Sequence, residues 1–451
     1  MISIIPVKKN DKITVSVSAI SSNGSGIAKV SGYTLFIPQT LPEDVAEVLV
    51  LKTKTSYGYA KLIKIISPSP HRTAVPCPHF EKCGGCQLMM ADYDYQKEIK
   101  IGFVKDALLR IGGIDADVDI IGADTPFRYR NKMIFPFDKD GNWGFYRERS
   151  HDVIPLSDCL LGDELNKIIM NTVADYMEKY GVSAYDEESH RGIIRRVFIR
   201  NTESEFIVII SANADALPHA DGLIKALTGI SDKISGIILN VNKNRTNFVL
   251  GNKNILLWGK NTLSASILGL KYEVSPESFF RVNPKQTEKL YSIALDFANI
   301  SKNDTILDIY CGIGTITLSA AKKAKAAIGI EIVEKAIDNA KQNAERNSVK
   351  NADFLCGKAE DLVPELLKEG VIPDIVILDP PRKGSDEKTL AAIAHSMPKR
   401  IVYVSCNPAT LARDAKFLGD LGYEVKNATA VDMFPHTAHI ECVVLLSRKS
   451  R

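Results

Sequence analysis

Hydrophobic and polar residues alternate over the first part of the chain, which is the pattern of short β-strands. Ile13, Val15 and Val17 alternate with polar residues, and an Asn-Gly-Ser-Gly turn signal follows. Further segments of this kind cover residues 34–37, 46–51 and 59–66. Short strands joined by glycine-containing turns predict a small closed barrel over residues 1–66. Such barrels commonly bind nucleic acid, although a β domain without a ligand would show the same pattern.

The last part of the chain has a different and more regular pattern, in which apolar strands alternate with amphipathic helices. Expected strands cover residues 305–310, 327–332, 353–356, 374–378, 400–404, 423–430 and 440–447, and expected helices cover residues 315–324, 334–347, 362–368, 387–396 and 410–421. This alternation predicts an α/β domain with a parallel doubly wound sheet, of the class I, Rossmann-like methyltransferase type, over residues 285–451. The last two strands have no helix between them, so we expect an antiparallel hairpin at one edge of the sheet.

Between these regions, residues 67–284 read as a central α+β domain. It starts with a Ser- and Pro-rich linker, and it contains a helix candidate at 163–179 and strand candidates at 193–199, 206–211 and 236–241. A division into 1–66, 67–284 and 285–451 suits a length of 451 residues, which is too long for one ordinary core.

Composition limits the class of protein without naming a partner. Hydrophobic residues make up 45% and charged residues 25%, and the net charge is only +3, so charge alone does not indicate a nucleic-acid binder. The sequence has no apolar run that could cross a bilayer and no signal-peptide pattern at its start. We therefore expect a cytoplasmic protein with no membrane partner, in which the eight cysteines are reduced.

A glycine loop follows the first strand of the α/β domain. Gly312 and Gly314 would let the backbone approach a ligand closely, while Thr317 stands where a dinucleotide fingerprint has its third glycine. Glu331 ends the next strand, where an acid can accept hydrogen bonds from ribose hydroxyls. The combination predicts an adenosyl ligand other than NAD; a purely structural turn with a surface glutamate is the alternative.

Two further motifs follow later strands of the same sheet. Asp379 begins an Asp-Pro-Pro-Arg sequence, and Cys406 lies in a Ser-Cys-Asn-Pro sequence. Because the carboxyl ends of parallel strands line one crevice, both motifs should open into the cleft of the glycine loop. Amino methyltransferases commonly have an aromatic residue where this chain has Arg382, so the stacking platform for an amine-bearing base is missing.

A cysteine in that cleft suits covalent chemistry on a uracil ring. Addition of the Cys406 thiolate to C6 would make C5 nucleophilic enough to accept a methyl group, and a base must then remove the C5 proton. Glu441 on the terminal strand is the best candidate for this base, and His436 and His439 compete with it. The plainer alternative is that Cys406 is a small buried residue.

A cysteine cluster follows the linker. Cys77, Cys83 and Cys86 lie within ten residues, and Cys159 could complete a set of four from a distance. Four thiolates suit zinc or an iron–sulfur cluster, and His79 could be a ligand if the metal is zinc. A metal-free cluster is the remaining alternative.

A stretch rich in aromatic and basic residues begins at Phe127 and runs to Arg149. It contains Arg128, Arg130 and Lys132, which we expect to contact RNA, because cations bind phosphates and aromatic rings stack on unpaired bases. A hairpin with inward-packed aromatics and solvated cations is the alternative.

Taken together, these residues resemble the TRAM-domain, iron–sulfur RNA uracil-C5 methyltransferases, and most closely the 23S rRNA enzymes of the RlmD and RlmCD type. The resemblance covers nearly the whole chain and implies a TRAM barrel that binds RNA. It places a [4Fe–4S] cluster on Cys77, Cys83, Cys86 and Cys159, the nucleophile on Cys406, the proton acceptor on Glu441, and S-adenosylmethionine contacts on Tyr310, Glu331 and Asp379, beside Gly312 of the glycine loop.

The chain departs from this family at one position. The family usually reads Ser-Phe-Phe-Gln-Val-Asn before the catalytic domain, and its glutamine contacts the cofactor, whereas residues 278–283 here carry Arg281 in that place. Arginine keeps the hydrogen-bond donors, adds a charge and removes the acceptor. We assign Arg281 to cofactor binding as well.

The resemblance implies a monomeric enzyme that makes 5-methyluridine in 23S rRNA from S-adenosylmethionine, with the target base flipped out of its stack. The same reaction on tRNA is the second hypothesis. A non-catalytic iron–sulfur module that binds RNA or senses redox state is a hypothesis of another class, and a zinc-dependent amino methyltransferase is a weaker one.

Overall fold

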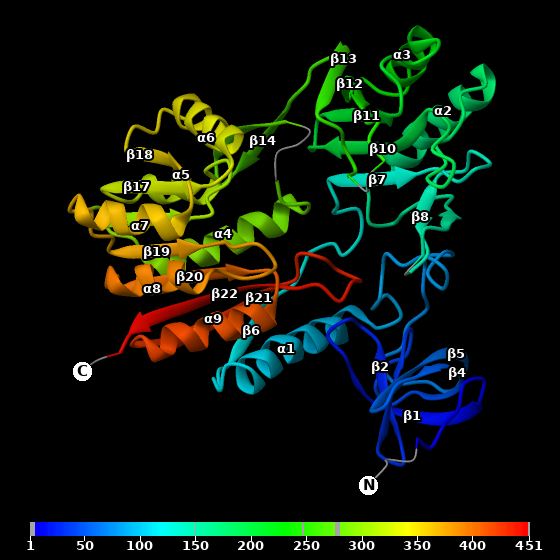
Figure 1. Ribbon diagram of the computed structural model, residues 1–451, viewed down its shortest axis with the longest axis horizontal. Coiled ribbons are helices and arrows are strands. Elements are labelled where there is room, and N and C mark those ends of the chain that lie inside the picture. Colours follow the sequence, from blue (N-terminus) through cyan, green and yellow to red (C-terminus); the bar gives the residue numbers. More distant parts are fainter. Residues whose placement is uncertain (1–4, 149, 246–247, 276–279, 450–451) are drawn as a thin grey trace.

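The computed structural model describes residues 5–148, 150–245, 248–275 and 280–449. Figure 1 shows a small barrel at the lower right, a central sheet with its helices above it, and a larger α/β region at the left. Within these described segments, no helix combines the length and the apolar character that a membrane crossing needs.

The N-terminal barrel forms from alternating strands, as the pattern predicts. Its strands are β1 (Lys12–Ile20), β2 (Gly26–Val30), β3 (Tyr33–Ile37), β4 (Val45–Thr53) and β5 (Tyr57–Ser67), and they close in the order β1-β2-β3-β5-β4. Val15, Val17 and Val48 point into the barrel core, while their polar neighbours face solvent. The predicted closed barrel is confirmed.

The central region contains a second sheet with the order β13-β12-β11-β10-β7. Its strands are β7 (Lys132–Pro136), β10 (Ile194–Asn201), β11 (Phe206–Ala212), β12 (Ile234–Val241) and β13 (Lys253–Gly259). Helices α2 (Leu165–Tyr180) and α3 (Ala220–Thr228) pack on one face through a shared apolar core. The short pair β8 (Gly144–Tyr146) and β9 (Val153–Pro155) lies beside β7.

The α/β region has a sheet with the order β18-β17-β16-β19-β20-β22-β21-β6. Its elements are β6 (Val118–Ile121), β16 (Thr305–Ile309), α5 (Thr315–Ala321), β17 (Ala326–Glu331), α6 (Glu334–Arg346), β18 (Ala352–Cys356), α7 (Ala359–Lys368), β19 (Ile375–Leu378), α8 (Glu387–His395), β20 (Arg400–Ser405), α9 (Pro408–Asp420), β21 (Tyr423–Val431) and β22 (Glu441–Arg448). The strands from β16 to β20 are parallel, so the predicted doubly wound fold is confirmed.

The terminal hairpin differs from the prediction in one respect. β21 and β22 are antiparallel as expected, but they are not the edge of the sheet, because β6 pairs in parallel with β21. Helix α1 (Tyr93–Arg110), which precedes β6, packs against α9 through Val104 and Leu108. A segment that the sequence assigned to the central domain therefore completes the α/β sheet, where it covers the otherwise open edge of β21.

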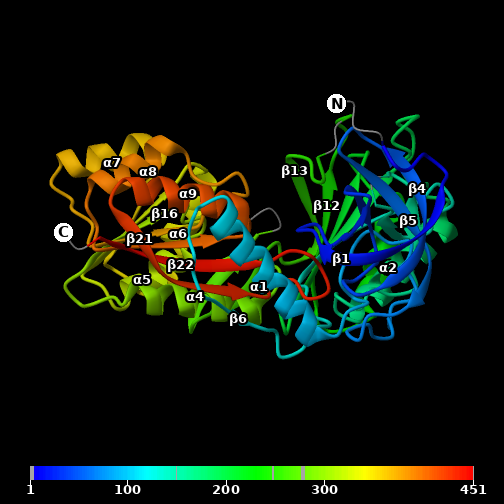
Figure 2. The ribbon, with the colours of Figure 1, turned by 90° about the horizontal axis from the view of Figure 1, so that it is seen from below.

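Helices cover both faces of this sheet. Figure 2 shows α7, α8 and α9 on one side and α4 (Pro284–Ala298) with α5 on the other. Neighbouring residues of β19 alternate between the two cores, since Ile375 packs toward α4 and α5 while Val376 packs toward α7 and α8. The hairpin of β14 (Leu263–Ile267) and β15 (Leu270–Val274) joins the first of these cores.

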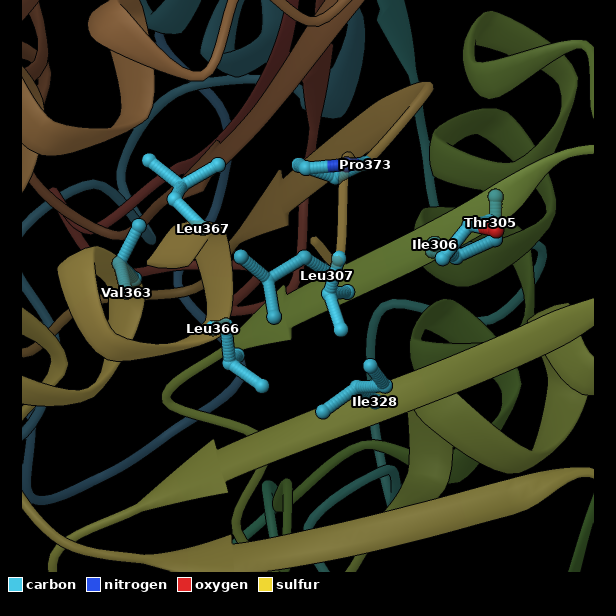
Figure 3. A pocket seen from close by; sticks show the side chains of 9 residues that line it. Thr305, Ile306, Leu307, Ile328, Val363, Leu366, Leu367 and Pro373 are labelled. Atoms are coloured by element: carbon cyan, nitrogen blue, oxygen red, sulfur yellow. The ribbon is translucent and has the colours of Figure 1, made fainter. Parts of the chain in front are cut away.

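The packing leaves a small void between α7 and the strands β16 and β17. Leu307, Ile328 and Leu366 are among its apolar lining residues (Figure 3). Its volume of ≈ 10 Å³ is at the lower limit for one water molecule, so we regard it as a packing defect and not as a ligand site.

Candidate active site

The glycine loop joins β16 to α5 at the carboxyl end of the sheet. Tyr310, Gly312 and Gly314 all have positive φ angles, of 69°, 57° and 81°, and turn the backbone sharply. The Gly312 N–H donates to Glu331 Oε2 at 3.2 Å. The structure therefore brings together the loop and the acid from which the sequence predicted an adenosyl ligand.

Sequence reasoning missed the part that Asp308 and Thr317 play behind this loop. Asp308 is fully buried in β16, and Thr317 Oγ1 donates to its Oδ2 at 2.6 Å. Burial raises the pKa of Asp308 to about 7. The residue that replaces the third glycine of a dinucleotide fingerprint thus bonds to a buried carboxyl group and ties α5 to β16.

Three predicted functional residues meet where β19, β20 and β22 end or begin. Asp379 follows β19, Cys406 follows β20, and Glu441 opens β22. The antiparallel register pairs Ser405 with Cys442, and Cys406 and Glu441 are the next residues beyond this pair. The charge of Glu441 acts on the Cys406 thiol, so the two groups lie near each other.

The two sequence motifs are also tied together. Asn407 Nδ2 donates to the Arg382 carbonyl oxygen at 3.0 Å, and Asn407 Oδ1 caps α9 by accepting from the Ala409 N–H. Cys406 therefore occupies a short strand-to-helix turn whose following residue is held from both sides. This turn fixes the thiol relative to the Asp-Pro-Pro-Arg motif.

Arg281 lies between Asp379 and Glu441, with only 7% of its surface exposed. Its Nη2 donates to both carboxylate oxygens of Asp379, at 2.6 and 2.8 Å, and its Nη1 contacts Glu441 Oε1 at 2.7 Å. Its Nε donates to Tyr291 Oη at 3.3 Å. The sequence assigned Arg281 to cofactor binding, whereas all three of its guanidinium nitrogens contact side chains of the protein. Ser278 and Phe279 of the same motif lie outside the described residues.

Burial and neighbouring charges shift the pKa values of Glu441 and Cys406. Burial raises the pKa of Glu441 to about 7, with Arg281 lowering it and Asp379 raising it. Burial, followed by the charges of Glu441 and Asp379, also raises the pKa of the Cys406 thiol, and Arg281 and Arg382 oppose this. Glu441 Oε2 is buried and has no hydrogen-bond partner among the residues described. An unpartnered oxygen of this kind is available to a proton of a bound substrate.

The two histidines that compete with Glu441 lie in different surroundings. His436 stacks on Phe127 with ring centroids 4.4 Å apart, its Nδ1 contacts Gln96, and burial lowers its pKa to about 4. Burial and then the charge of Arg382 lower the pKa of His439. His436 therefore belongs to the packing between the cysteine region and the α/β region, while His439 lies nearer to the Asp-Pro-Pro-Arg motif.

The four predicted cluster cysteines line one pocket of ≈ 520 Å³, although Cys159 is far from the others in sequence. Cys77, Cys83, Cys86 and Cys159 are all partly buried, and the Gly85 N–H donates to Cys83 Sγ at 3.4 Å. In the described part of the chain, no three His, Cys, Asp or Glu side chains are close enough to share a single metal ion.

The expected RNA contacts also lie at this pocket. Arg128 forms an ion pair of 2.6 Å with Asp158 and donates to the carbonyl oxygen of Cys159. Arg130 and Lys132 line the pocket, and burial lowers the pKa of Lys132 to about 8. The charge of Arg128 is neutralised by its ion pair with Asp158. The aromatic residues Phe135 and Trp143 of the same stretch are buried in the central core, and Arg149 lies outside the described residues.

A link between the cysteine segment and the active site was not predictable from the sequence. The N–H groups of Gln87 and Leu88 both donate to the His436 carbonyl oxygen, at 3.0 and 2.9 Å, and the Ala438 N–H donates to Gln87 Oε1 at 3.3 Å. The segment after Cys86 thus holds the loop that leads to Glu441.

The doubly wound sheet and the glycine loop with its acid at the carboxyl ends of the strands define a class I S-adenosylmethionine-dependent methyltransferase. Residues 237–449 match the family described as tRNA (Uracil-5-)-methyltransferase, and residues 6–63 match the TRAM domain. The chain belongs to this RNA uracil-5 methyltransferase family and is an enzyme of that kind.

Individual relatives support this assignment. An "Uncharacterized RNA methyltransferase" of Clostridium tetani is 42% identical, with 98% of each chain covered, and one of Halalkalibacterium halodurans is 43% identical, with 99% of each covered. The crystal structure of Pyrococcus abyssi tRNA (uracil-54, C5)-methyltransferase with S-adenosyl-L-homocysteine is similar, with 26% identity and a TM-score of 0.77. The match covers 96% of this chain and 100% of that one.

Proposed function

We propose that this enzyme methylates C5 of a uridine in 23S rRNA, with Cys406 as nucleophile and Glu441 as general base. The observation that carries the proposal is that Cys406 directly follows β20 and Glu441 opens the paired strand β22, so that the charges of Glu441 and Asp379 both act on the thiol. A thiol and a carboxyl group on one side of a cleft are the two groups that covalent methylation of a uracil ring requires.

The residues have separate tasks in this mechanism. The Cys406 thiolate forms a bond to C6, and the electron pair of the C5–C6 double bond moves to C5, which can then accept a methyl group. S-adenosylmethionine supplies that methyl group when it is bound. Glu441 next takes the C5 proton, the C5–C6 double bond re-forms, and Cys406 leaves as thiolate.

We assign the cofactor site to Tyr310, Gly312, Glu331, Asp379 and Arg281. The residues fit an adenosyl ligand, because the positive φ angles of the loop expose backbone to the cleft and Glu331 lies directly beside Gly312. Arg281 contributes to this site by holding Asp379.

We also propose that Cys77, Cys83, Cys86 and Cys159 hold a [4Fe–4S] cluster. The four thiols line one pocket, and a cluster takes one thiolate on each iron. We assign the cluster a structural role, because no step of the mechanism transfers an electron.

The two candidate functions differ in the RNA that is the substrate. Resemblance to the 23S rRNA enzymes favours rRNA, whereas the matched family and the Pyrococcus abyssi protein are named for tRNA, which makes tRNA the second candidate. We place the reaction in the cytoplasm and assign the enzyme as a monomer. We expect Arg128, Arg130 and Lys132 to contribute to RNA binding through the pocket wall more than through direct phosphate contacts.

The test is methyl transfer from labelled S-adenosylmethionine to unmodified 23S rRNA and tRNA transcripts, followed by nucleoside analysis. We expect 5-methyluridine in 23S rRNA and none with the Cys406→Ala variant. Product only in tRNA would establish the second candidate. No methylated uridine in either RNA, from protein with its cluster intact, would refute the proposal and favour the RNA-binding or redox module. Retained activity of Cys406→Ala would refute the covalent mechanism.

A further inference from the structure

We propose that Arg281 is a positioning residue that favours the ionised form of Glu441 and directs its free oxygen toward the C5 proton of the covalent intermediate. This inference rests on the proposed function, and it goes beyond the assignment of Arg281 to cofactor binding. It concerns the position at which the chain carries arginine in place of the glutamine of the family that it resembles.

Arg281 binds only one of the two carboxylate oxygens of Glu441. Arg281 Nη1 binds only Oε1 of Glu441, at 2.7 Å, and Oε2 is left buried without a partner in the described part of the chain. Asp379 anchors the other side of the guanidinium with two bonds, and Tyr291 holds Nε. Because the guanidinium is planar and bonded on three sides, it restricts rotation of the Glu441 carboxyl group.

The charges support the same conclusion. The groups that face Glu441 are Arg281 and Asp379, Arg382 after β19, and the Cys406 thiol. The charge of Asp379 raises the pKa of Glu441, and the charge of Arg281 lowers it. Arg281 lies between the two carboxylates, since it contacts both of them directly.

A glutamine at this position could still donate a hydrogen bond to either carboxylate, but it carries no charge. With Arg281 replaced by glutamine, Glu441 would be protonated over a wider range of pH. A protonated Glu441 cannot accept the C5 proton, so Cys406 stays bonded to the methylated base. The methyl group is then already on C5, while the C6–S bond persists.

The sign of the effect on pH follows directly. An opposite charge next to a carboxyl group lowers its pKa by about 1–3 units, so loss of the charge should move the acid limb for breakdown of the adduct upward by about 1–3 pH units. Below the new limb, Arg281→Gln should accumulate a denaturation-stable protein–RNA adduct that carries the methyl label. Raising the pH should release 5-methyluridine from it.

The experiment compares wild type, Arg281→Gln, Arg281→Lys and Glu441→Gln in single-turnover reactions across pH, with adduct and product measured separately. Arg281→Lys keeps the positive charge but loses the planar set of hydrogen-bond donors, so it should keep the wild-type acid limb at a lower rate. It is measured in the same way, so that a glutamine variant that fails to fold does not remove the test. Glu441→Gln should hold the adduct at every pH.

An unchanged acid limb in Arg281→Gln, with only the KM for S-adenosylmethionine raised, would overturn the inference and make Arg281 a cofactor contact alone. An acid limb that moves equally in Arg281→Lys would also overturn it, because charge would not be the cause. If wild type forms no 5-methyluridine and Glu441→Gln forms no adduct, the proposed function itself fails. The two failures are therefore distinguishable.

Discussion

Lys100→Met should open the contact between α1 and the loop that leads to Glu441. Lys100 and Asp432 are both completely buried, and their ion pair is 2.5 Å long. Lys100 Nζ also donates to the Phe434 carbonyl oxygen at 3.0 Å, and Tyr93 Oη donates to Asp432 at 2.9 Å. The variant leaves the Asp432 carboxylate buried with the Tyr93 hydroxyl as its remaining side-chain partner among those described.

The magnitude follows from this burial. Removing one partner of a buried ion pair costs about 3–5 kcal/mol, because the remaining charge loses its compensation. Since about 1.4 kcal/mol is a factor of ten, the opening equilibrium of α1 and the 432–440 loop should rise by two to nearly four orders of magnitude. The double variant Lys100→Met/Asp432→Asn should recover part of this loss, because it removes the unpaired charge and keeps an acceptor for Tyr93.

Hydrogen exchange read by peptide mass spectrometry is the appropriate assay. The two tryptophans, Trp143 and Trp258, both belong to the central region, so their fluorescence would miss an opening of the α/β region. Peptides from α1 and β21 should lose protection in the single variant, while peptides from the N-terminal barrel should not change. Unchanged exchange in α1 would refute the reasoning, and so would a double variant that exchanges faster than the single one.

Two further predictions concern buried charge elsewhere. Burial raises the pKa of Asp308 to about 7, so the folded state binds this proton more tightly than the unfolded chain. The protonated carboxyl group should therefore contribute fully to stability below about pH 4, and this contribution should be lost as the pH rises through about 7. The variant Asp308→Asn should show a smaller fall in Tm between about pH 5 and 8. An equal fall in both proteins would contradict this. Arg128→Ala should lower the iron and sulfide bound per chain, because it releases Asp158 and the carbonyl oxygen of Cys159. The control variant Arg110→Ala, on the exposed surface of α1, should leave both unchanged. Equal iron content in the two variants would show that Arg128 does not support the pocket.

Local patterns were sufficient to predict the barrel and the doubly wound sheet. The change from a period of two to alternating strands and helices separates the barrel from the doubly wound sheet, because each element must bury one face. The same logic predicted which motifs share a cleft. Asp379 and Cys406 follow neighbouring parallel strands, and the carboxyl ends of such strands lie at one edge.

Only the tertiary structure decided how the charged residues are used. Arg128 looked like an RNA contact from its basic and aromatic neighbours, but its partner Asp158 lies thirty residues away and is invisible to a local pattern. Arg281 looked like a cofactor contact, and the two carboxylates that it binds come from distant strands. The partner of a long charged side chain depends on which segments the fold brings within a few ångströms of it.

The added strand β6 has the same explanation. Its four residues have no periodicity that distinguishes a central-domain strand from an edge strand of the α/β sheet, and its pairing with β21 spans most of the chain. Periodicity determines which residues of this protein are buried and in what kind of element. Pairing between distant segments depends on the whole packed core. It determines the edge of the sheet, the contact of Arg281 with Glu441 and the link from the cysteine segment to the active site.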